Sequence, residues 1–209
     1  MRKMIFLAHV SLDGFMAGPN GEMDWITYDE DLEQYVHSLH RTTDAAVYGR
    51  ATYQMMESYW PMVLADPTSK GGALEHAQWL DNATKIVVST TLDSFHWNNT
   101  VLIRDNVAQQ LTKIKEQPGK DLWLIGSPRL AQSLTRLGLI DEYWLNVNPV
   151  ILGSGMPYAM GMEAVKHLKL LESRTFKGGV VALRYGSVPT KEQQPVAEIG
   201  TDAHRSAGN

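Results

Sequence analysis

The chain of 209 residues contains no cysteine. Disulfide bonds, thiolate nucleophiles and zinc–cysteine sites are therefore excluded, and the composition is compatible with the reducing cytoplasm. The sequence has 7 histidines, but none follow the HxH or HxxxH spacing that commonly marks metal ligands. The histidine spacing therefore gives no support for a metal site, and we expect none.

An excess of positive charge and a long apolar run are also lacking. The chain has 19 lysines and arginines against 23 aspartates and glutamates, a net charge of −4, so it lacks the basic footprint of a nucleic-acid-binding protein. No apolar run approaches the roughly 18 residues of a membrane span. Arg2 and Lys3 precede a short apolar stretch without a cleavage site, so we expect a cytoplasmic protein without a signal peptide.

The residues present favour one globular domain, because 44% of the chain is hydrophobic. Met4–Val10 is an apolar run that predicts a strand buried on both faces of a sheet. It leads into a glycine-bearing loop, residues 11–25, which contains Asp13. A buried strand that delivers such a loop from its carboxyl end is where open α/β sheets bind ligands. The alternative is an ordinary surface loop that ends on a core tryptophan.

Strand and helix patterns alternate along the chain, which predicts an α/β fold with a largely parallel sheet and helices on both faces. The last two strands have the spacing of an antiparallel hairpin at one edge. Residues 189–209 are polar, without apolar periodicity, and we interpret them as a disordered tail. The expected strands are 4–10, 45–48, 84–88, 101–103, 121–125, 139–147, 168–175 and 180–185, and the expected helices are 29–42, one between Gly49 and Pro61, 73–80, 107–115 and 130–137.

Three predicted strands end in residues that suit phosphate binding. Gly49 and Arg50 follow one strand, Ser89 follows the next, and Gly126 and Ser127 follow a third. Glycine allows close backbone approach, a helix N-terminus offers free N–H groups, and arginine adds a charged fork. Each signal is weak by itself, since helix entries and turns use the same residues without any ligand.

Five stretches, taken together, resemble the dihydrofolate reductase superfamily, specifically its riboflavin-pathway reductase-like (RibD C-terminal) branch. They are SLDGFMAG with its continuation PNGEMDW, VYGRATY, IVVSTT, LWLIGSPRLAQSL and LIDEYWLNVNPVILGSGMP. The resemblance implies a dihydrofolate reductase-like three-layer sandwich over residues 1–188, with a mixed, mostly parallel sheet and a C-terminal antiparallel hairpin. It also implies an oxidoreductase that transfers a hydride from NADPH to a small pterin- or pyrimidine-like heterocycle, without a metal or covalent intermediate.

The resemblance also assigns roles to residues by their position in these motifs. No arginine follows Ser89 directly, so the preference for NADPH over NADH is inferred from the family rather than from a 2′-phosphate ligand in the sequence. The cofactor-binding residues that the resemblance implies are Ala8, His9, Ala17 and Gly18 at the nicotinamide, Gly49, Arg50 and Thr52 at the phosphates, Ser89 and Thr90 near the 2′-phosphate, and Gly126, Ser127, Pro128 and Arg129 at the pyrophosphate.

On the substrate side, Asp31 matches the acid that polarises the pterin in folate-reducing members, with Trp25 and Tyr35 beside the substrate. A partly buried carboxylate there could hold substrate N–H groups and favour protonation. Asp31 also suits the first turn of a helix, where acids favour the dipole. Asp13 is the second catalytic candidate, and its alternative role is to cap the glycine turn.

Two positions depart from the riboflavin-pathway reductases that the chain resembles. Leu7 stands where those enzymes carry a lysine, and Ile125 stands where they carry an acid. Both changes remove polar groups that would grip a phosphoribosyl-aminopyrimidine, so we expect a different planar substrate. The alternative function is a non-catalytic protein that binds the nucleotide cofactor on the same fold.

The segment Tyr143–Leu152 is apolar and ends near Pro149. We expect it to lie near a sheet edge with Trp144 facing outward, and we expect a homodimer that forms partly through this region.

Overall fold

The computed structural model describes residues 1–160 and 165–188. Within these residues, eight strands form one sheet in the order β5-β4-β3-β6-β1-β7-β10-β9, and β2 pairs with β8 in a small separate sheet. The strands are β1 (Met4–Val10), β2 (Phe15–Ala17), β3 (Thr43–Gly49), β4 (Thr84–Val88), β5 (Thr100–Ile103), β6 (Asp121–Ile125), β7 (Glu142–Val147), β8 (Met156–Pro157), β9 (Leu168–Thr175) and β10 (Val181–Ser187).

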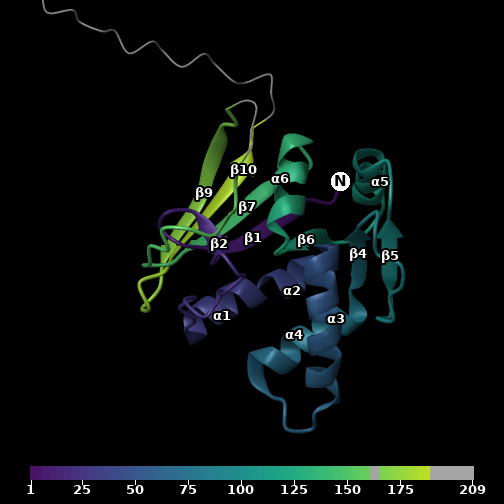
Figure 1. Cartoon of the computed structure of the whole chain (residues 1–209), viewed down its shortest axis with the longest axis horizontal. Coiled ribbons are helices and arrows are strands. Elements are labelled where there is room, and N and C mark those ends of the chain that lie inside the picture. Colours follow the sequence, from purple (N-terminus) through teal and green to yellow (C-terminus); the bar gives the residue numbers. More distant parts are fainter. Residues whose placement is uncertain (161–164, 189–209) are drawn as a thin grey trace, which may run out of the picture.

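The strands from β5 to β7 are parallel, and β10 and β9 add antiparallel strands beyond β7. Figure 1 shows the sheet running from β9 at one end to β5 at the other. The α/β class, the mostly parallel mixed sheet and the C-terminal hairpin are confirmed. The helices are α1 (Glu30–His37), α2 (Leu39–Thr42), α3 (Arg50–Ala65), α4 (Gly71–Asn82), α5 (Val107–Glu116) and α6 (Pro128–Arg136).

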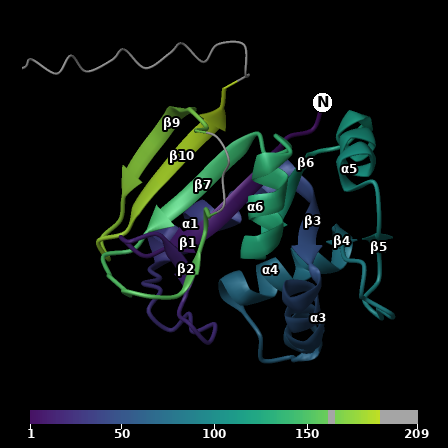
Figure 2. The same ribbon diagram turned by 45° about the horizontal axis from the view of Figure 1, so that its top comes forward.

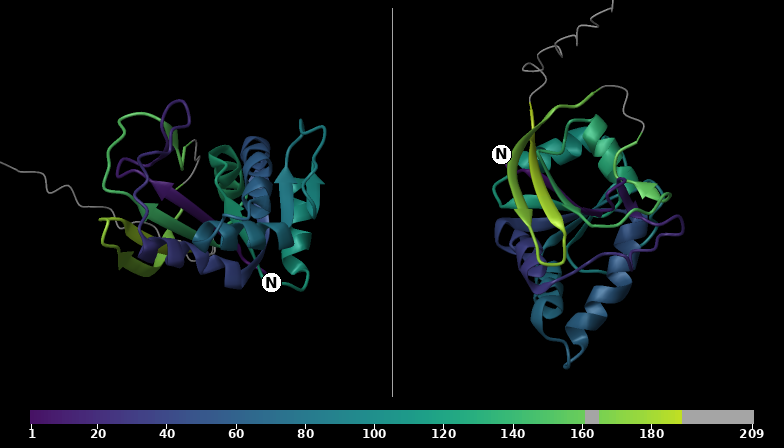
Figure 3. Two further views of the ribbon diagram at one scale, coloured as in Figure 1. Left: turned by 90° about the horizontal axis from the view of Figure 1, so that it is seen from below. Right: turned by 90° about the vertical axis from the view of Figure 1, so that its left-hand side faces the viewer.

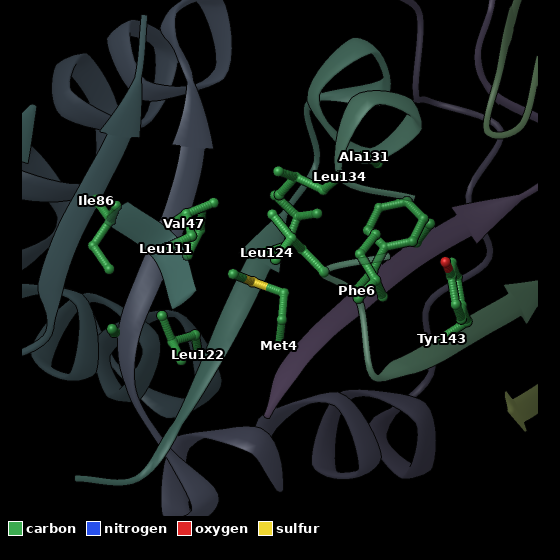
Figure 4. Close-up of a cluster of buried hydrophobic side chains, with 14 of the residues drawn as sticks. Met4, Phe6, Val47, Ile86, Leu111, Leu122, Leu124, Ala131, Leu134 and Tyr143 are labelled. Carbon is green, nitrogen blue, oxygen red and sulfur yellow. The ribbon is translucent and has the colours of Figure 1, made fainter. Parts of the chain in front are cut away.

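Successive side chains of β1 point to opposite faces of the sheet, so they belong to two separate parts of the core. Met4 and Phe6 pack with residues of α5 and α6, as the close-up in Figure 4 shows for Phe6, Ala131 and Leu134. Ile5 and Leu7 belong to the cluster on the other face, under α1 and α2. The helices therefore cover both sides of the sheet, and β1 lies in its interior as its apolar run predicts.

Helix α1 begins at Asp29, whose carboxylate accepts a hydrogen bond from the Leu32 N–H at 2.8 Å. The same carboxylate accepts from the Gly178 N–H, 2.9 Å away in the hairpin loop between β9 and β10. This cap ties the first helix to the C-terminal hairpin. The single helix expected over residues 29–42 is divided at Ser38 into α1 and α2.

The structure corrects two expectations about boundaries and edges. Pro61 does not end α3, which continues to Ala65; Pro61 is exposed, and water can replace the backbone hydrogen bond that a proline removes. Trp144 does not face outward, since it is 7% exposed and β7 is paired with β1 and β10 on its two sides. The hairpin that follows residue 168 covers β7, so the edge strands are β5 and β9.

The loop after β1 is fixed by residues that follow β7. Figure 3 shows both segments on the same side of the molecule, where β2 pairs with β8. A Cβ on Gly155 would come within 2.2 Å of the Ala17 carbonyl oxygen, so only glycine allows this approach. The expected tail, residues 189–209, lies outside the described residues. Across the described helices, none has the length and apolarity needed to cross a membrane.

Candidate functional site

The carboxyl ends of β4, β3 and β6 meet at one edge of the sheet, because these three strands are parallel neighbours. Gly49 pairs with Val88 of β4, and Val47 pairs with Leu124 of β6. The turns after the three strands therefore converge, as expected from the sequence. Figure 2 shows β3 leading directly into α3 at this edge.

Four residues lie together at these strand ends and are called the strand-end cradle below: Gly49, Thr52, Gly126 and Ser127. Ser127 Oγ accepts a hydrogen bond from the Gly49 N–H at 2.8 Å and donates one to Thr52 Oγ1 at 2.8 Å. Gly126 and Ser127 both have positive φ, +56° and 57°. A Cβ on Gly126 would lie 3.2 Å from Thr52 Cγ2, so a side chain there would crowd the cradle.

Two helices begin at this cradle, and each has an arginine in its first turn. Arg50 is the first residue of α3, and Pro128 and Arg129 open α6. Both arginine side chains are exposed, and neither makes a side-chain hydrogen bond or ion pair with any described residue. Free helix N–H groups together with available guanidinium groups make this edge suited to an anion such as a phosphate.

Ser89 follows β4 and organises the third turn. Its Oγ accepts hydrogen bonds from the N–H groups of Thr91 and Leu92, at 3.1 and 3.0 Å. Arg104, which follows β5, donates to the carbonyl oxygens of Thr90 and Leu92, at 3.4 and 2.6 Å. The sequence has no arginine directly after Ser89, but the neighbouring strand brings one to the same turn.

A cavity of about 310 Å³, the His9 cavity, lies beside the cradle on the α1 side of the sheet. Leu7 and Ile125, which pair across β1 and β6, contribute to its wall, and Gly126 of the cradle directly follows Ile125. The chain therefore passes directly from the wall of the His9 cavity, at Ile125, into the strand-end cradle, at Gly126. The residues that line the His9 cavity are Leu7, His9, Tyr28, Glu33, Val36, His37, Trp60, Gly72, Ala73, His76, Trp123 and Ile125.

His9 is the polar group that the buried first strand brings into this cavity. Burial lowers the pKa of His9 to about 4, so its imidazole is neutral at neutral pH. Its ring lies 5.4 Å from the ring of Tyr28, measured between centroids. His9 Nδ1 is buried and has no hydrogen-bond partner among the described residues. A buried polar atom without a partner is rare, and His9 is also one of the residues that line the cavity, which favours this place as a ligand site.

The candidate substrate residues are divided between two places. Asp31 and Tyr35 line a neighbouring depression over α1 and α2 instead of the His9 cavity. Asp31 is half exposed and lies 3.8 Å from the exposed Lys177 ammonium. In the described lining of the His9 cavity the carboxylate is that of Glu33, two residues further along α1. The helical period, which turns successive residues to different faces, separates Asp31 from Glu33.

Asp13 and Trp25 take part in loop structure. Hydrogen bonds from the Ser11 side chain and from the N–H groups of Gly153 and Leu152 lower the pKa of Asp13. Asp13 therefore ties the loop after β1 to the loop after β7, which agrees with its alternative role as a turn cap. The Trp25 indole N–H donates to the Glu22 carbonyl oxygen at 3.0 Å.

The other residues expected at the nicotinamide lie around the end of β1. Ala8 is buried and belongs to the core on the α6 face, opposite to His9. Ala17 is buried in β2, and the Gly18 N–H donates to the Glu22 carbonyl oxygen at 2.9 Å. These residues thus shape the loop that covers the strand end.

The structure also assembles a group that the histidine spacing does not reveal. His37, His40 and His76 each offer a ring nitrogen, and these nitrogens lie within 4.8 Å of one another. His37 and His40 are three residues apart, and His76 comes from α4. Burial lowers the pKa of His40 to about 4 and that of His76 to about 3. The HxxH spacing was the available signal, but only the packing of α4 supplies the third histidine.

A larger cavity of about 500 Å³ lies on the opposite face, between α6 and β10. Its walls are mainly apolar and include Leu145, Leu183 and Tyr185. The strand-end cradle and the unpaired His9 nitrogen make the His9 cavity the better candidate for chemistry.

The chain is similar to several known proteins along most of its length. The chain is 35% identical over 184 residues to uncharacterized protein YyaP of Bacillus subtilis (strain 168), covering 88% of this chain and 94% of YyaP. A putative riboflavin biosynthesis protein from Shewanella sp. PV-4 superposes with a TM-score of 0.71 at 20% identity, covering 90% of this chain and 99% of that one. Dihydrofolate reductase from Enterococcus faecalis, complexed with NADP(H), superposes with a TM-score of 0.58 at 13% identity, covering 88% of this chain and 96% of the other.

The order of strands, the helices on both faces and these superpositions define a protein of the dihydrofolate reductase-like fold class. Within that class the match is more specific. Residues 2–182 match the family model described as RibD C-terminal domain, and the chain belongs to that family.

Proposed function

We propose that this protein is an oxidoreductase that uses NADPH to reduce a small, planar heterocycle of the pterin or pyrimidine type. One observation carries the proposal: the strand-end cradle, with its hydrogen bond from Gly49 to Ser127, adjoins the His9 cavity through Ile125. A phosphate-binding edge next to a cavity with a buried polar group is the arrangement that a dinucleotide and its substrate require.

The cofactor's pyrophosphate would lie against the strand-end cradle. The N-termini of α3 and α6 provide N–H groups and a favourable dipole, and the exposed Arg50 and Arg129 provide charge. The crowding that a Cβ on Gly126 would cause fits a surface where a ligand approaches the backbone closely. When bound, NADPH supplies the hydride, and the chain's own residues position it.

The preference for NADPH is supported by the turn after β4. Ser89 and Thr90 lie there, and Arg104 donates to the backbone of the same turn. A guanidinium at the ribose end of a dinucleotide favours a 2′-phosphate over a free hydroxyl. Arg104 is therefore the cation that we assign to the 2′-phosphate.

The substrate would occupy the His9 cavity. Neutral His9 has an unpaired Nδ1 that can hydrogen-bond a ring N–H or carbonyl group, and Glu33 can hold substrate N–H groups. Leu7 and Ile125 make the wall between them apolar, at the two positions where the resembled riboflavin-pathway reductases are polar. A flat ring without a phosphoribosyl group fits this lining better than a phosphorylated pyrimidine does. The geometry favours Glu33 over Asp31 as the acid.

The test combines binding and turnover. NADPH is titrated against the protein by fluorescence, and its oxidation is then followed at steady state with a panel of pterins, pyrimidines and quinones. Saturable NADPH binding with turnover of a pterin or pyrimidine would support the proposal. Tight binding without turnover on the whole panel would favour the non-catalytic cofactor-binding alternative, and absence of NADPH binding would refute both.

We also propose that the protein works in the cytoplasm as a homodimer. The sequence expectation placed the contact around Trp144, but that residue is buried. The edge strand β9 offers a different surface, since it is exposed along most of its length and carries Leu170 and Leu171 at 50% and 46% exposure. A second copy of the chain that pairs along this edge would satisfy its free backbone groups.

A further inference from the structure

The imidazole rings of His37, His40 and His76 form a compact group where the end of α1 and α2 meet α4. The centroids of the His37 and His40 rings are 4.6 Å apart, and those of His40 and His76 are 5.0 Å apart. His40 Nε2 and His76 Nδ1 are 2.8 Å apart and share one hydrogen bond. The ring nitrogens of the three histidines therefore lie within 4.8 Å of one another, brought together from α1, α2 and α4.

We propose that His37, His40 and His76 form a binding site for a divalent transition metal, with Zn²⁺ as the ion that suits it. Imidazole nitrogen is a preferred ligand of zinc, copper and nickel, and three histidines are an established zinc ligand set that leaves a fourth position open.

The required movement is small. Two ligands of a tetrahedral zinc ion, each about 2.0–2.1 Å from the metal, lie about 3.3 Å apart. The His40 and His76 nitrogens are closer than this, at 2.8 Å, while each pair in the group lies within 4.8 Å. Side-chain rotations can bring the three nitrogens to these distances. The proton shared by His40 and His76 moves to the other ring nitrogen of its histidine, and two metal–nitrogen bonds replace the hydrogen bond.

Two carboxylates lie near the three histidines but outside the group whose ligand atoms are within 4.8 Å of one another. Glu33 and the His37 ring both lie against Gly72, where an added Cβ would come within 2.0 Å of Glu33 Oε1 and 2.6 Å of His37 Cε1. Glu75 precedes His76 and lines the neighbouring depression together with His37 and His40. These carboxylates would surround the ion, and a water molecule can take the fourth position that three histidine ligands leave open.

The residues around the three histidines indicate how a bound metal would affect the structure. His37 and His76 line the His9 cavity, so the metal would lie in its wall and join α4 to α1 and α2. Trp79 packs 5.2 Å from His40, and Trp60 packs 4.5 Å from His76, measured between ring centroids. The competing explanation is that these are neutral histidines that merely stack with tryptophans, in which case no metal would bind.

The experiment uses the full chain without an affinity tag, stripped with a chelator and dialysed. Zn²⁺ is titrated in competition with a chromophoric chelator, and the Co²⁺ form is examined by visible absorption. We expect one equivalent of Zn²⁺ to bind per chain, a tetrahedral Co²⁺ spectrum and an increased melting temperature with Zn²⁺. Because Trp60 and Trp79 adjoin the site, Cu²⁺ should also quench tryptophan fluorescence with the same stoichiometry.

Variants locate the site. His37→Ala and His40→Ala should each weaken Zn²⁺ binding by more than about tenfold, since even loss of an outer-shell partner costs that much. The matched controls His96→Ala and His167→Ala change exposed histidines outside the group and should leave binding unchanged. Circular dichroism of each metal-free variant checks folding.

X-ray absorption of the unmutated zinc form keeps the test independent of variant folding. Three imidazole ligands at about 2.0–2.1 Å would support the site. Absence of saturable Zn²⁺ binding, coordination by fewer than three imidazoles, or equal losses in the His96 and His167 controls would overturn it. None of these readouts depends on NADPH, so failure here leaves the proposed reductase activity standing.

Discussion

The Gly49 N–H donates a hydrogen bond to Ser127 Oγ at 2.8 Å, joining residues separated by 78 positions in the chain. Gly49 ends β3 just before α3, and Ser127 precedes α6. This hydrogen bond therefore holds the N-terminus of α3 beside the N-terminus of α6. Ser127 can reach Gly49 because its backbone is left-handed, with φ of 57°. The strand-end cradle is therefore held in place by hydrogen bonds of the protein itself, without the help of a ligand.

Removing the Ser127 hydroxyl should weaken the cradle. In Ser127→Ala the Gly49 N–H and the Thr52 hydroxyl lose their shared partner, which we expect to lower the free energy of unfolding by about 1–3 kcal/mol. Urea denaturation measures the change. The control Ser58→Ala removes an exposed hydroxyl of α3 and should cost no more than about 0.5 kcal/mol. Equal effects of the two substitutions would contradict a special role for Ser127.

Arg50 should contribute to cofactor affinity without supporting the fold. Because its exposed side chain has no partner within the described residues, Arg50→Ala should leave stability nearly unchanged and weaken NADPH binding by about 1–3 kcal/mol, the value of a charged hydrogen bond. Fluorescence titration with NADPH provides the measurement. Lys113→Ala, which removes an exposed cation from α5, is the control. Unchanged affinity in the Arg50 variant would remove this residue from the site.

Arg104 should distinguish the two nicotinamide cofactors. If it meets the 2′-phosphate, Arg104→Ala should reduce affinity for NADPH by about 1–3 kcal/mol and leave NADH binding nearly unchanged. Parallel titrations with both cofactors give the ratio. Because the guanidinium also donates to the Thr90 and Leu92 carbonyl oxygens, melting temperatures should be compared first. An equal loss for both cofactors would indicate damage to the turn instead.

Glu142 should make the free energy of unfolding depend on pH in the acidic range. Burial alone would raise its pKa, but hydrogen bonds from Arg184, Lys3 and Trp144 outweigh this and lower the pKa to about 2. The stabilisation is therefore complete above the ordinary value of 4.5 and is lost as the pH falls towards about 2. Glu142→Gln should cost about 3 kcal/mol at neutral pH.

Denaturation curves at several pH values check the Glu142 prediction. The difference between the original protein and Glu142→Gln should shrink as the pH falls below about 4.5, because the carboxylate becomes protonated in both folded and unfolded chains. Glu116→Gln changes an exposed acid at the end of α5 and should follow the original protein throughout. A difference that is constant with pH would rule out the charge as its cause.

His9 should make the free energy of unfolding depend on pH in a second range, above that of Glu142. Its folded pKa of about 4 lies below the ordinary 6.5, so its stabilising contribution is present above about pH 6.5 and is lost as the pH falls towards 4. Between about pH 7 and about pH 5 the original protein should lose about 2 kcal/mol more than His9→Phe does. The exposed His96→Phe should show the original slope. Parallel profiles for all three proteins would disprove the effect of burial.

The homodimer can be tested by light scattering. A chain of 23.4 kDa should give twice that mass, and Leu170→Lys on the exposed edge strand β9 should shift the mass towards the monomer. Ile151→Lys, at an exposed position of the segment first expected to form the contact, is the control. A monomeric mass for the original protein would refute the dimer.

The sequence by itself determined the fold class and the edge of the sheet where we propose that a ligand binds. The apolar run Met4–Val10 predicted a buried strand, and the strand and helix alternation predicted a mostly parallel sheet. Parallel strands deliver their carboxyl-end turns to one edge, so the convergence of Gly49, Ser89 and Gly126 followed from order alone. These features depend on local periodicity and turn chemistry, which neighbouring residues determine.

The tertiary structure decided which side chains share a space. Glu33, and not Asp31, faces the His9 cavity, because helix rotation relative to the sheet is set by packing. Trp144 is buried because Tyr35 of α1 packs 5.3 Å from its ring, measured between centroids, and Arg184 of β10 lies over the same ring. Arg104 joins the turn of Ser89, and His76 joins His37 and His40, through pairing and packing between distant segments. Contacts of this kind depend on the whole fold, which a reading of local patterns does not specify.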